Sequence, residues 1–414
     1  MPLNRMTTAM VASRPGPELT APARPGRVPV PVPVMRVGTA SPLDVLVAGT
    51  ECGRYCAGRG ADGPEYSWIR TYGVLVMRET VTASELDLAL VNALQLRPRA
   101  SWSELSPLLG VTAGTLARRW ERLTGAGLAW VYAAPGREFS GNRCTAFVLV
   151  RCRPQERERL LAELTLLPEA VTVEVTAPGS ADLLLDVLAP DLPSLSRFLT
   201  QGLERLPGIE SVSALLATSL YVEGSRWRLR SLDPSQLTAL GSQTAAQEPV
   251  SGLGLDPVDR ALLGELVRDG RLGLAELAER TDTSPATVRR RLRRLTDSAV
   301  LTFRCDIADA LAGHPVPVSL LGRVPARDIG AVHRTLAALP ECRVVAAVTG
   351  PANVFATLWV HDLGDIQRRE TALCARLPTL TVTDRIVGLH TVKRMGHLLD
   401  EEGRRIGVRP ISPW

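Results

Sequence analysis

The clearest pattern of apolar positions lies in the stretch 284–295. Val288, Leu292 and Leu295 stand at i, i+4 and i+7, which places them on one face of a helix. The stretch opens with Ser284 and a proline, and serine at the N-cap followed by proline is a typical helix start. The pattern predicts a short helix that packs this apolar stripe against a small core.

Two more short helices are predicted immediately before it. The first opens at 255–259 and ends at Asp269, and the second covers 274–278. The turn 280–283 then leads into the helix 284–295. Three short helices with a tight turn before the last are typical of a helix-turn-helix, whose last helix lies in the major groove of DNA. The pattern therefore predicts a DNA-binding domain.

Arginines cover the rest of this last helix, and we expect all five of them to be exposed. Lys393 is the only lysine among 48 basic residues, so arginine is favoured throughout the chain, and an ordinary solvated helix face is the alternative. The two helices in front favour DNA binding. On DNA, the arginines would contact phosphates and the N-terminal residues would contact bases. The candidates are Ser284, Thr287, Arg289, Arg290, Arg291, Arg293 and Arg294.

The same unit occurs earlier in the chain, where Asp87 matches Asp259 and Leu94 matches Leu266 at a constant offset. A domain type that occurs twice determines the architecture of the whole chain. The chain therefore contains a second predicted helix-turn-helix.

The earlier copy of the DNA-binding helix covers 112–123 and differs at two positions. Ala117 replaces Arg289, and Glu121 replaces Arg293. With less positive charge, this helix should hold phosphate less strongly. Its candidate DNA contacts are Thr112, Thr115, Arg118, Arg119 and Arg122.

A segment that alternates strands and helices follows each helix-turn-helix. The order in both is β-α-β-β-α-β, the ferredoxin-like split βαβ arrangement. One residue is missing from the second copy, in the hairpin between the second and third strands, where a loop tolerates loss. The predicted elements are 146–152, 154–166, 170–175, 182–188, 192–205 and 209–216, then 316–321, 326–338, 343–348, 354–360, 363–376 and 381–387.

Composition limits the remaining possibilities. The chain has 414 residues, 45% of them hydrophobic, and its net charge of +5 suits an anionic partner. No apolar run approaches the roughly 20 residues that span a bilayer, and no secretory signal is recognisable, so we expect a cytoplasmic protein without membrane contact. Seven cysteines and five histidines show no metal-ligand spacing. They predict reduced thiols and no metal or other cofactor.

The N-terminal stretch 1–76 has no helix or strand period and contains repeated Val-Pro pairs. We expect it to be a disordered tail. Met77 stands directly before the first patterned segment, which suggests that the native chain starts there.

These motifs, in this order and present twice, resemble the Lrp/AsnC family of bacterial and archaeal transcription regulators. The family opens with Leu-Asp-x-x-Asp, here 255–259, and continues with Ser-Pro-x-x-Val-x-x-Arg-x-x-x-Leu, here 284–295. Its ligand-sensing hairpin carries Gly-x-x-Asp, which reads Gly-Ser-Ala-Asp at 179–182 and Gly-Pro-Ala-Asn at 350–353. The resemblance covers residues 85 to about 400.

The resemblance implies a regulator that binds double-stranded DNA in a sequence-specific way and responds to a small molecule, often an amino acid. It also implies that the two halves form an intramolecular pseudo-dimer, with further homo-oligomerisation. For the hairpins the alternative is structural: the glycines supply the positive φ of a tight turn, and the last residue caps it. The candidate ligand residues are Gly179, Ser180, Asp182, Gly350, Ala352 and Asn353.

The predicted fold class is α+β, with two winged helix-turn-helix domains alternating with two ferredoxin-like βαββαβ domains. The predicted boundaries are 83–135 and 255–305 for the helix-turn-helix domains, 143–228 and 314–400 for the ligand-sensing domains, and 229–254 for the linker.

Two other functions stay open. A sirohaem decarboxylase-like tetrapyrrole enzyme resembles this family in fold and also occurs as a tandem fusion. Its expected Arg-Arg-Phe-Gly-like run is replaced here by Leu-Thr-Phe-Arg-Cys at 301–305, and a basic DNA-binding helix would have no use in it. A partner protein that does not bind DNA would suit the helix 112–123 but not the helix 284–295. We therefore expect a regulator rather than an enzyme.

Overall fold

The structure is a computed structural model, and it describes residues 66–71, 74–79, 83–136, 143–224, 227–241, 254–313 and 316–411. Of the tail predicted for residues 1–76, residues 1–65 lie outside the described residues. Strands β1 (Tyr66–Thr71) and β2 (Val74–Glu79) pair antiparallel, with Trp68 opposite Met77. Residues 66–71 and 74–76 therefore differ from the predicted tail, because pairing satisfies their backbone hydrogen bonds.

The two helix-turn-helix units form where the apolar spacing predicts them. In the second unit Ser284 caps the last helix, since its Oγ accepts a hydrogen bond from Thr287 N at 3.1 Å, and Val288, Leu292 and Leu295 are buried. The helices are α1 (Glu85–Leu96), α2 (Trp102–Leu109) and α3 (Ala113–Gly125) in the first unit, and α8 (Pro257–Arg268), α9 (Leu274–Arg280) and α10 (Pro285–Asp297) in the second.

A buried carboxylate fastens the last helix of the second unit, and it corrects the expectation that all five arginines of α10 are exposed. Asp259 is completely buried at the start of α8, and it accepts from Arg291 at 2.9 Å and from Arg294. The side chain of Arg291 is only 17% exposed, because Asp256 holds it as well, at 2.5 Å. Two of the five arginines therefore hold the domain together.

The first unit uses the same device. Asp87 is also completely buried, and it pairs with Arg119 at 3.0 Å and with Arg122 at 2.6 Å. Burial favours the neutral acid, but hydrogen bonds from Ser84, Arg119 and Arg122 hold the pKa of Asp87 below its usual range. The second aspartate of the Leu-Asp-x-x-Asp motif thus has a structural purpose.

The strands that follow the two helix-turn-helix units pair with each other. Strand β3 (Ala129–Pro135) runs antiparallel to β8 (Leu301–Ile307) along its whole length, with Tyr132 opposite Arg304. We call this two-stranded sheet the ribbon. Because each unit contributes one strand, the ribbon joins the two DNA-binding domains directly.

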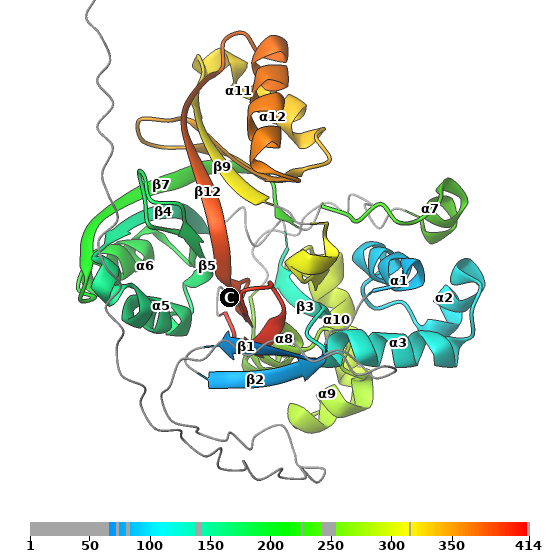
Figure 1. Ribbon diagram of the computed structural model, residues 1–414. Helices are drawn as coiled ribbons and strands as arrows, with labels where there is room; N and C mark the ends of the chain where they lie inside the picture. The colour runs from blue at the N-terminus through cyan, green and yellow to red at the C-terminus, as the bar shows by residue number, and fades with distance from the viewer. Residues whose placement is uncertain are drawn as a thin grey trace, which may run out of the picture. The chain divides into compact units, whose positions relative to one another are not determined.

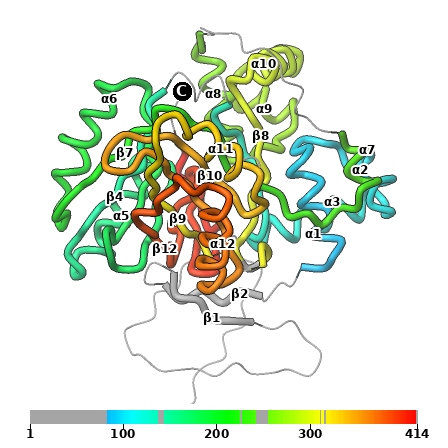
Figure 2. The backbone as a smooth tube through the Cα atoms, turned by 90° about the horizontal axis from the view of Figure 1, so that it is seen from above, coloured from blue at the N-terminus to red at the C-terminus, as the bar shows by residue number. Residues whose placement is uncertain are grey.

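Part of the predicted linker 229–254 is ordered and packs on the first helix-turn-helix unit. Helix α7 (Pro234–Leu240) buries Leu240 in that unit's core, and Gln236 Nε2 donates to Leu108 O at 2.9 Å. Figure 2 shows α7 beside α2. The structure differs from the prediction here because the stretch is mostly polar, yet its few leucines find an apolar surface to pack against. Residues 242–253 lie outside the described residues.

Both ferredoxin-like domains have the predicted β-α-β-β-α-β order, with their helices packed on one face of the sheet. In the first domain, α6 continues into a π-helical turn at 198–203. The elements are β4 (Cys144–Cys152), α5 (Arg157–Leu166), β5 (Ala170–Thr176), β6 (Leu183–Ala189), α6 (Leu192–Arg197) and β7 (Ile209–Val222), then β9 (Val316–Arg323), α11 (Ile329–Ala337), β10 (Cys342–Val348), β11 (Val354–Val360), α12 (Leu363–Arg376) and β12 (Thr381–Arg394).

The last strand of each domain is longer than predicted and reaches into the other domain. The start of β7 pairs with β4 and its end with β10, whereas the start of β12 pairs with β9 and its end with β5. Figure 1 shows β12 running from β9 to β5. Eight strands thereby close into a ring of pairs, in the order β12-β5-β6-β4-β7-β10-β11-β9 and back to β12. Short strands β13 (His397–Leu399) and β14 (Arg405–Val408) extend the sheet past the predicted boundary at 400.

No helix within the described residues is both long and apolar enough to cross a membrane.

The buried anchor of α10 makes a prediction about stability. Replacing Asp259 with alanine leaves Arg291 and Arg294 without their buried partner, and we expect a loss of about 3 kcal/mol in the free energy of unfolding. Urea denaturation followed by circular dichroism measures it. The matched control is Asp297→Ala, which removes an exposed carboxylate 3.9 Å from Arg293 and should cost less than about 0.5 kcal/mol. Equal losses in the two variants would contradict the anchoring role.

Candidate functional site

The surface expected to meet DNA is smaller than the sequence indicates. With Arg291 and Arg294 held by the buried aspartate, α10 exposes Arg289, Arg290 and Arg293, the last with 83% of its side chain accessible. Within the described residues, Arg289 and Arg290 make no ion pair at all. The positions that match these three on α3 are Ala117, Arg118 and Glu121.

Hydroxyl groups lie at the N-termini of both DNA-binding helices. Ser284 Oγ donates to Thr287 Oγ1 at 2.9 Å, and the hydroxyls of Thr112 and Thr115 lie 3.0 Å apart. Each pair caps its helix and stays at or near the surface. The structure therefore brings together the predicted base-contacting residues of each helix at one end.

The predicted ligand residues of the hairpins have structural partners. Asp182 Oδ2 accepts from Cys152 N at 2.9 Å. At the matching position, Asn353 Oδ1 accepts from Val324 N at 3.0 Å and its Nδ2 donates to Val324 O at 2.7 Å. Both side chains fasten the hairpin to the end of the first strand of its domain. A ligand role for these residues stays a prediction.

The two hairpin glycines differ, although the sequence suggested one conformation for both. Gly350 has φ of +108°, which favours glycine, whereas Gly179 is not in the left-handed region. The missing residue in the second hairpin gives the physical reason, because a shorter connection needs a tighter turn. Of the remaining candidates, Ser180 is exposed and Ala352 is buried between the sheets.

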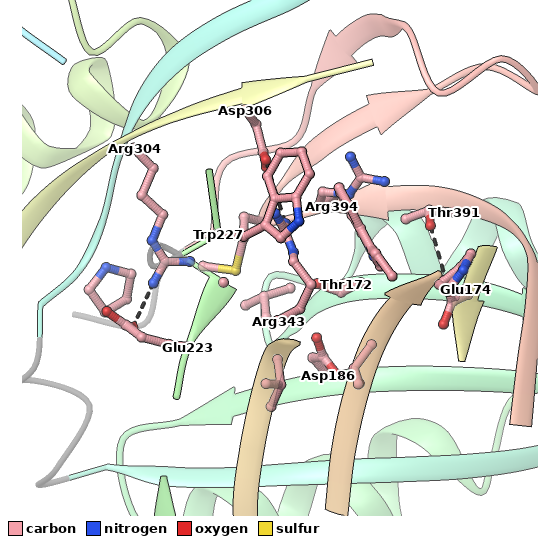
Figure 3. Close-up of a pocket in the computed structure, with 18 of the residues that line it drawn as sticks. Thr172, Glu174, Asp186, Glu223, Trp227, Arg304, Asp306, Arg343, Thr391 and Arg394 are labelled. Carbon is pink, nitrogen blue, oxygen red and sulfur yellow. Dashed lines mark hydrogen bonds and ion pairs between the residues drawn. The ribbon is translucent and has the colours of Figure 1, made fainter. Parts of the chain in front are cut away.

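A cavity of about 150 Å³ lies where the ribbon faces the ring of strands, and we call it the central cavity. Residues of both ribbon strands and of all eight ring strands line it, and Figure 3 shows its charged side chains. None of the DNA-binding or ligand-binding candidates from the sequence lines it, but Phe303, Arg304 and Cys305 of the stretch 301–305 do. Two tryptophans, Trp227 and Trp359, form part of its wall.

Three arginines of the central cavity already face carboxylates. Arg304 pairs with Glu223 at 2.6 Å and Arg394 pairs with Asp309 at 2.8 Å. Arg343 lies 3.6 Å from Asp306 and stacks on a tryptophan, with its guanidinium carbon 3.8 Å from the centre of the Trp359 ring.

Two acids of the cavity, Glu174 and Asp186, make no ion pair within the described residues. Glu174 is 8% exposed and, among the described residues, accepts one long hydrogen bond, 3.4 Å, from Thr391 Oγ1, while Asp186 accepts one from Thr172. Burial, and then the nearby charge of Asp186, raises the pKa of Glu174 to about 8, and burial raises the pKa of Asp186 to about 6. A signal for both was present in the sequence, since each acid interrupts an apolar strand, as in Leu-Leu-Leu-Asp-Val-Leu.

The raised pKa of Glu174 predicts a loss of stability with rising pH. The neutral acid is favoured in the folded protein, so its contribution is complete below about pH 4.5, the ordinary pKa, and is lost as pH rises through about 8. Glu174→Gln should therefore gain a few kcal/mol relative to the unmodified chain between pH 5 and 9, at about 1.4 kcal/mol per pKa unit. Melting temperatures across that range measure it. Glu163→Gln replaces an exposed acid paired with Arg159, and its melting temperature should change with pH as that of the unmodified chain does. The same behaviour in Glu174→Gln would contradict the raised pKa of Glu174.

Known proteins resemble this chain in separate parts. The AsnC-type helix-turn-helix domain matches residues 84–124 and 255–296, and the Lrp/AsnC ligand binding domain matches 145–227. An uncharacterised HTH-type transcriptional regulator of Pyrococcus horikoshii is 30% identical over 141 residues, which are 34% of this chain and 89% of the relative. The HTH-type transcriptional regulator Ptr1 of Methanocaldococcus jannaschii is 26% identical over 142 residues, 34% of this chain and 95% of the relative.

Solved structures of one protein, with and without a bound tetrapyrrole analogue, resemble most of the chain. The siroheme decarboxylase NirDL, in complex with an iron-uroporphyrin III analogue, aligns with 79% of this chain and 95% of its own, with a TM-score of 0.52 and 14% identity. Identity this low establishes a shared fold and nothing about activity. The paired matches to the helix-turn-helix model and the relative of 30% identity decide the family, and the chain belongs to the Lrp/AsnC family of helix-turn-helix transcription regulators.

Proposed function

We propose that this chain binds double-stranded DNA as a sequence-specific regulator and that its second helix-turn-helix provides most of the affinity. The observation that carries the proposal is the row of exposed arginines Arg289, Arg290 and Arg293 on α10, which remain available after two others are bound by Asp259. Exposed arginines on a helix of this kind contact phosphates and release counterions.

Base contacts come from the N-terminal end of each DNA-binding helix. In α10 these residues are Ser284, Thr287 and Arg289, whose side chains lie near the end that enters the major groove. In α3 they are Thr112 and Thr115. Since Glu121 stands where α10 has Arg293, the first helix contributes less to phosphate binding, and the two half-sites are not equivalent.

The two halves act as an intramolecular pseudo-dimer. Cross-pairing of β7 with β10 and of β12 with β5 supports this, as does the ribbon between the helix-turn-helix units. A covalent dimer places both DNA-binding helices on one operator without an association step. The proposal also includes further homo-oligomerisation of the chain. It places the protein in the cytoplasm, where DNA is available.

A small-molecule effector, such as an amino acid, belongs to the same proposal. The hairpins at 179–182 and 350–353 are one place for it, because each is tied to the last strand of the other half: Ala177 N donates to Val387 O and Thr349 N to Leu216 O, both at 2.8 Å. A ligand there would contact the junction of the two halves.

The central cavity gives the tetrapyrrole alternative a physical test, and its residues do not fit that group. A cavity of about 150 Å³ has room for a molecule the size of benzene, and a tetrapyrrole is several times larger. Arginines line the cavity, as that alternative expects, but Arg304, Arg343 and Arg394 are already paired with carboxylates of this chain. The acids Glu174 and Asp186 would repel a ligand rich in carboxylates, and no histidine is among the described lining residues. We therefore propose a non-enzymatic regulator, and an unchanged visible spectrum after sirohaem is mixed with the chain is the expected result.

Arginine variants at matching positions test the DNA-binding proposal. Arg290→Ala should weaken binding about equally for all DNA sequences, lower the slope of log K against log salt by about 1, and leave base preference unchanged. Arg118→Ala, its counterpart on α3, should have a smaller effect. Fluorescence anisotropy measures both effects, with DNA duplexes from the region upstream of the gene that encodes this chain and at several salt concentrations.

Three outcomes of that titration would contradict the proposal. An altered base preference in Arg290→Ala would overturn its phosphate role, and equal losses in the two variants would overturn the dominance of the second helix. Absence of DNA binding by the unmodified chain at every salt concentration would overturn the function itself.

A further inference from the structure

We propose that the central cavity binds a small organic cation, an amine carried on an apolar or aromatic body, with its charged group between Glu174 and Asp186. This inference rests on the proposed function, because it names the chemical class of the effector. It assigns the effector to a different place from the hairpins.

Duplication makes the two sides of the cavity comparable, and they have diverged in charge. Glu174 and Asp186 of the first domain match Ala346 and Thr357 of the second. Conversely, Arg343 and Arg394 of the second domain match Val171 and Glu223 of the first. Two identical subunits cannot build such a cavity, because symmetry would repeat each residue on both sides. The fused chain has an acidic side and a basic side.

The acidic side makes no ion pair. Within the described part of the chain, no arginine, lysine or histidine nitrogen lies within 4.0 Å of the carboxylate of Glu174 or Asp186. The groups that face Glu174 are Asp186 from β6, Thr391 and Arg394 from β12, and Asp309. The charge of Arg394 lowers the pKa of Glu174, but Arg394 itself pairs with Asp309 at 2.8 Å. Two acids close together in a buried place favour either protonation or a bound cation.

The basic side has its charge balanced already. Arg304, Arg343 and Arg394 each face a carboxylate of this chain, at 2.6, 3.6 and 2.8 Å. An anionic ligand would have to displace one of those carboxylates from its arginine. A fourth lining arginine, Arg228, donates to Trp227 O at 2.8 Å. Glu174 and Asp186 are the lining carboxylates without an ion pair among the described residues, and a cation would supply one.

The walls of the cavity suit an apolar body of limited size. Phe147, Leu184, Leu188 and Trp359 line it, and its volume of about 150 Å³ matches a single aromatic ring. Aromatic faces also attract a cation directly. An amine with one ring or a short alkyl chain therefore fits the volume as well as the charge.

A ligand in this cavity contacts the ribbon that joins the two DNA-binding units. Tyr132 from β3 and Phe303 from β8 line the cavity, and Asp306 of β8 accepts from the Tyr132 hydroxyl at 3.2 Å. An amine that binds more tightly to one arrangement of the ribbon than to another shifts the spacing of the two helices on DNA. The cavity is thus placed to couple the ligand to DNA binding.

The test is isothermal titration of the full chain with 2-phenylethylamine, benzylamine and agmatine. The matched neutral and anionic controls are 2-phenylethanol and 3-phenylpropanoate. At least one amine should bind saturably, and neither control should bind within tenfold of its affinity. At pH 7 the binding should release protons, because an ammonium group favours the ionised form of Glu174, whose pKa without ligand is about 8. The measured heat should accordingly depend on the buffer's ionisation enthalpy, and affinity should rise from pH 6 to 8.

Variants identify the site. Glu174→Gln should weaken amine binding at least tenfold and abolish the proton release, and Asp186→Asn, the second variant, should weaken it as well. Glu163→Gln, on the exposed face of α5, should bind like the unmodified chain. Circular dichroism and melting temperature establish that each variant is folded.

Several results would overturn the inference: no binding by any of the three amines, equal binding of the alcohol, or unchanged affinity in both cavity variants. DNA binding is measured on the same samples by anisotropy. Intact DNA binding without amine binding removes this inference and leaves the proposed function standing. Amine binding without DNA binding removes the proposed function and leaves the cavity as a cation site.

Discussion

The exchange of long final strands between the two ferredoxin-like domains is the constraint on which the rest of this structure depends. Because β7 and β12 each continue into the other domain's sheet, eight strands close into a ring, and neither domain has an unpaired edge at the junction. The stacked rings of Phe147 and Phe355, with centroids 3.8 Å apart, lie between the sheets and fill part of the interior. The ring fixes the walls of the central cavity and the place where the ribbon meets them.

Arginine has two different purposes in the DNA-binding units, and buried aspartates separate them. Asp87 and Asp259 each bind the two arginines that face the first helix of their unit. Outside these aspartate pairs lie a row of three arginines on α10 and, on α3, one arginine with a glutamate three residues further on. A chain in which nearly every basic residue is arginine needs this distinction, because count alone does not show which side chains are available to phosphate.

Fusion of two copies permits asymmetry that an ordinary dimer cannot have. The second helix-turn-helix has kept more basic residues than the first, and the cavity has acids from one domain and arginines from the other. Both differences arise at matching positions of the repeat. They give one chain two unequal helix-turn-helix units and a cavity of mixed charge, and the ribbon connects the two units.

The sequence by itself determined the elements and their order, since apolar spacing, helix caps and the repeat offset can be read directly from the order of the residues. Ser284 as N-cap, the buried stripe of α10 and the β-α-β-β-α-β order were predicted in this way. Only the tertiary structure decided the burial of Arg291, the ordered part of the linker, the extension of β7 and β12, and the cavity around Glu174. The physical reason is that each of these depends on partners far away in the chain, which no local period reveals.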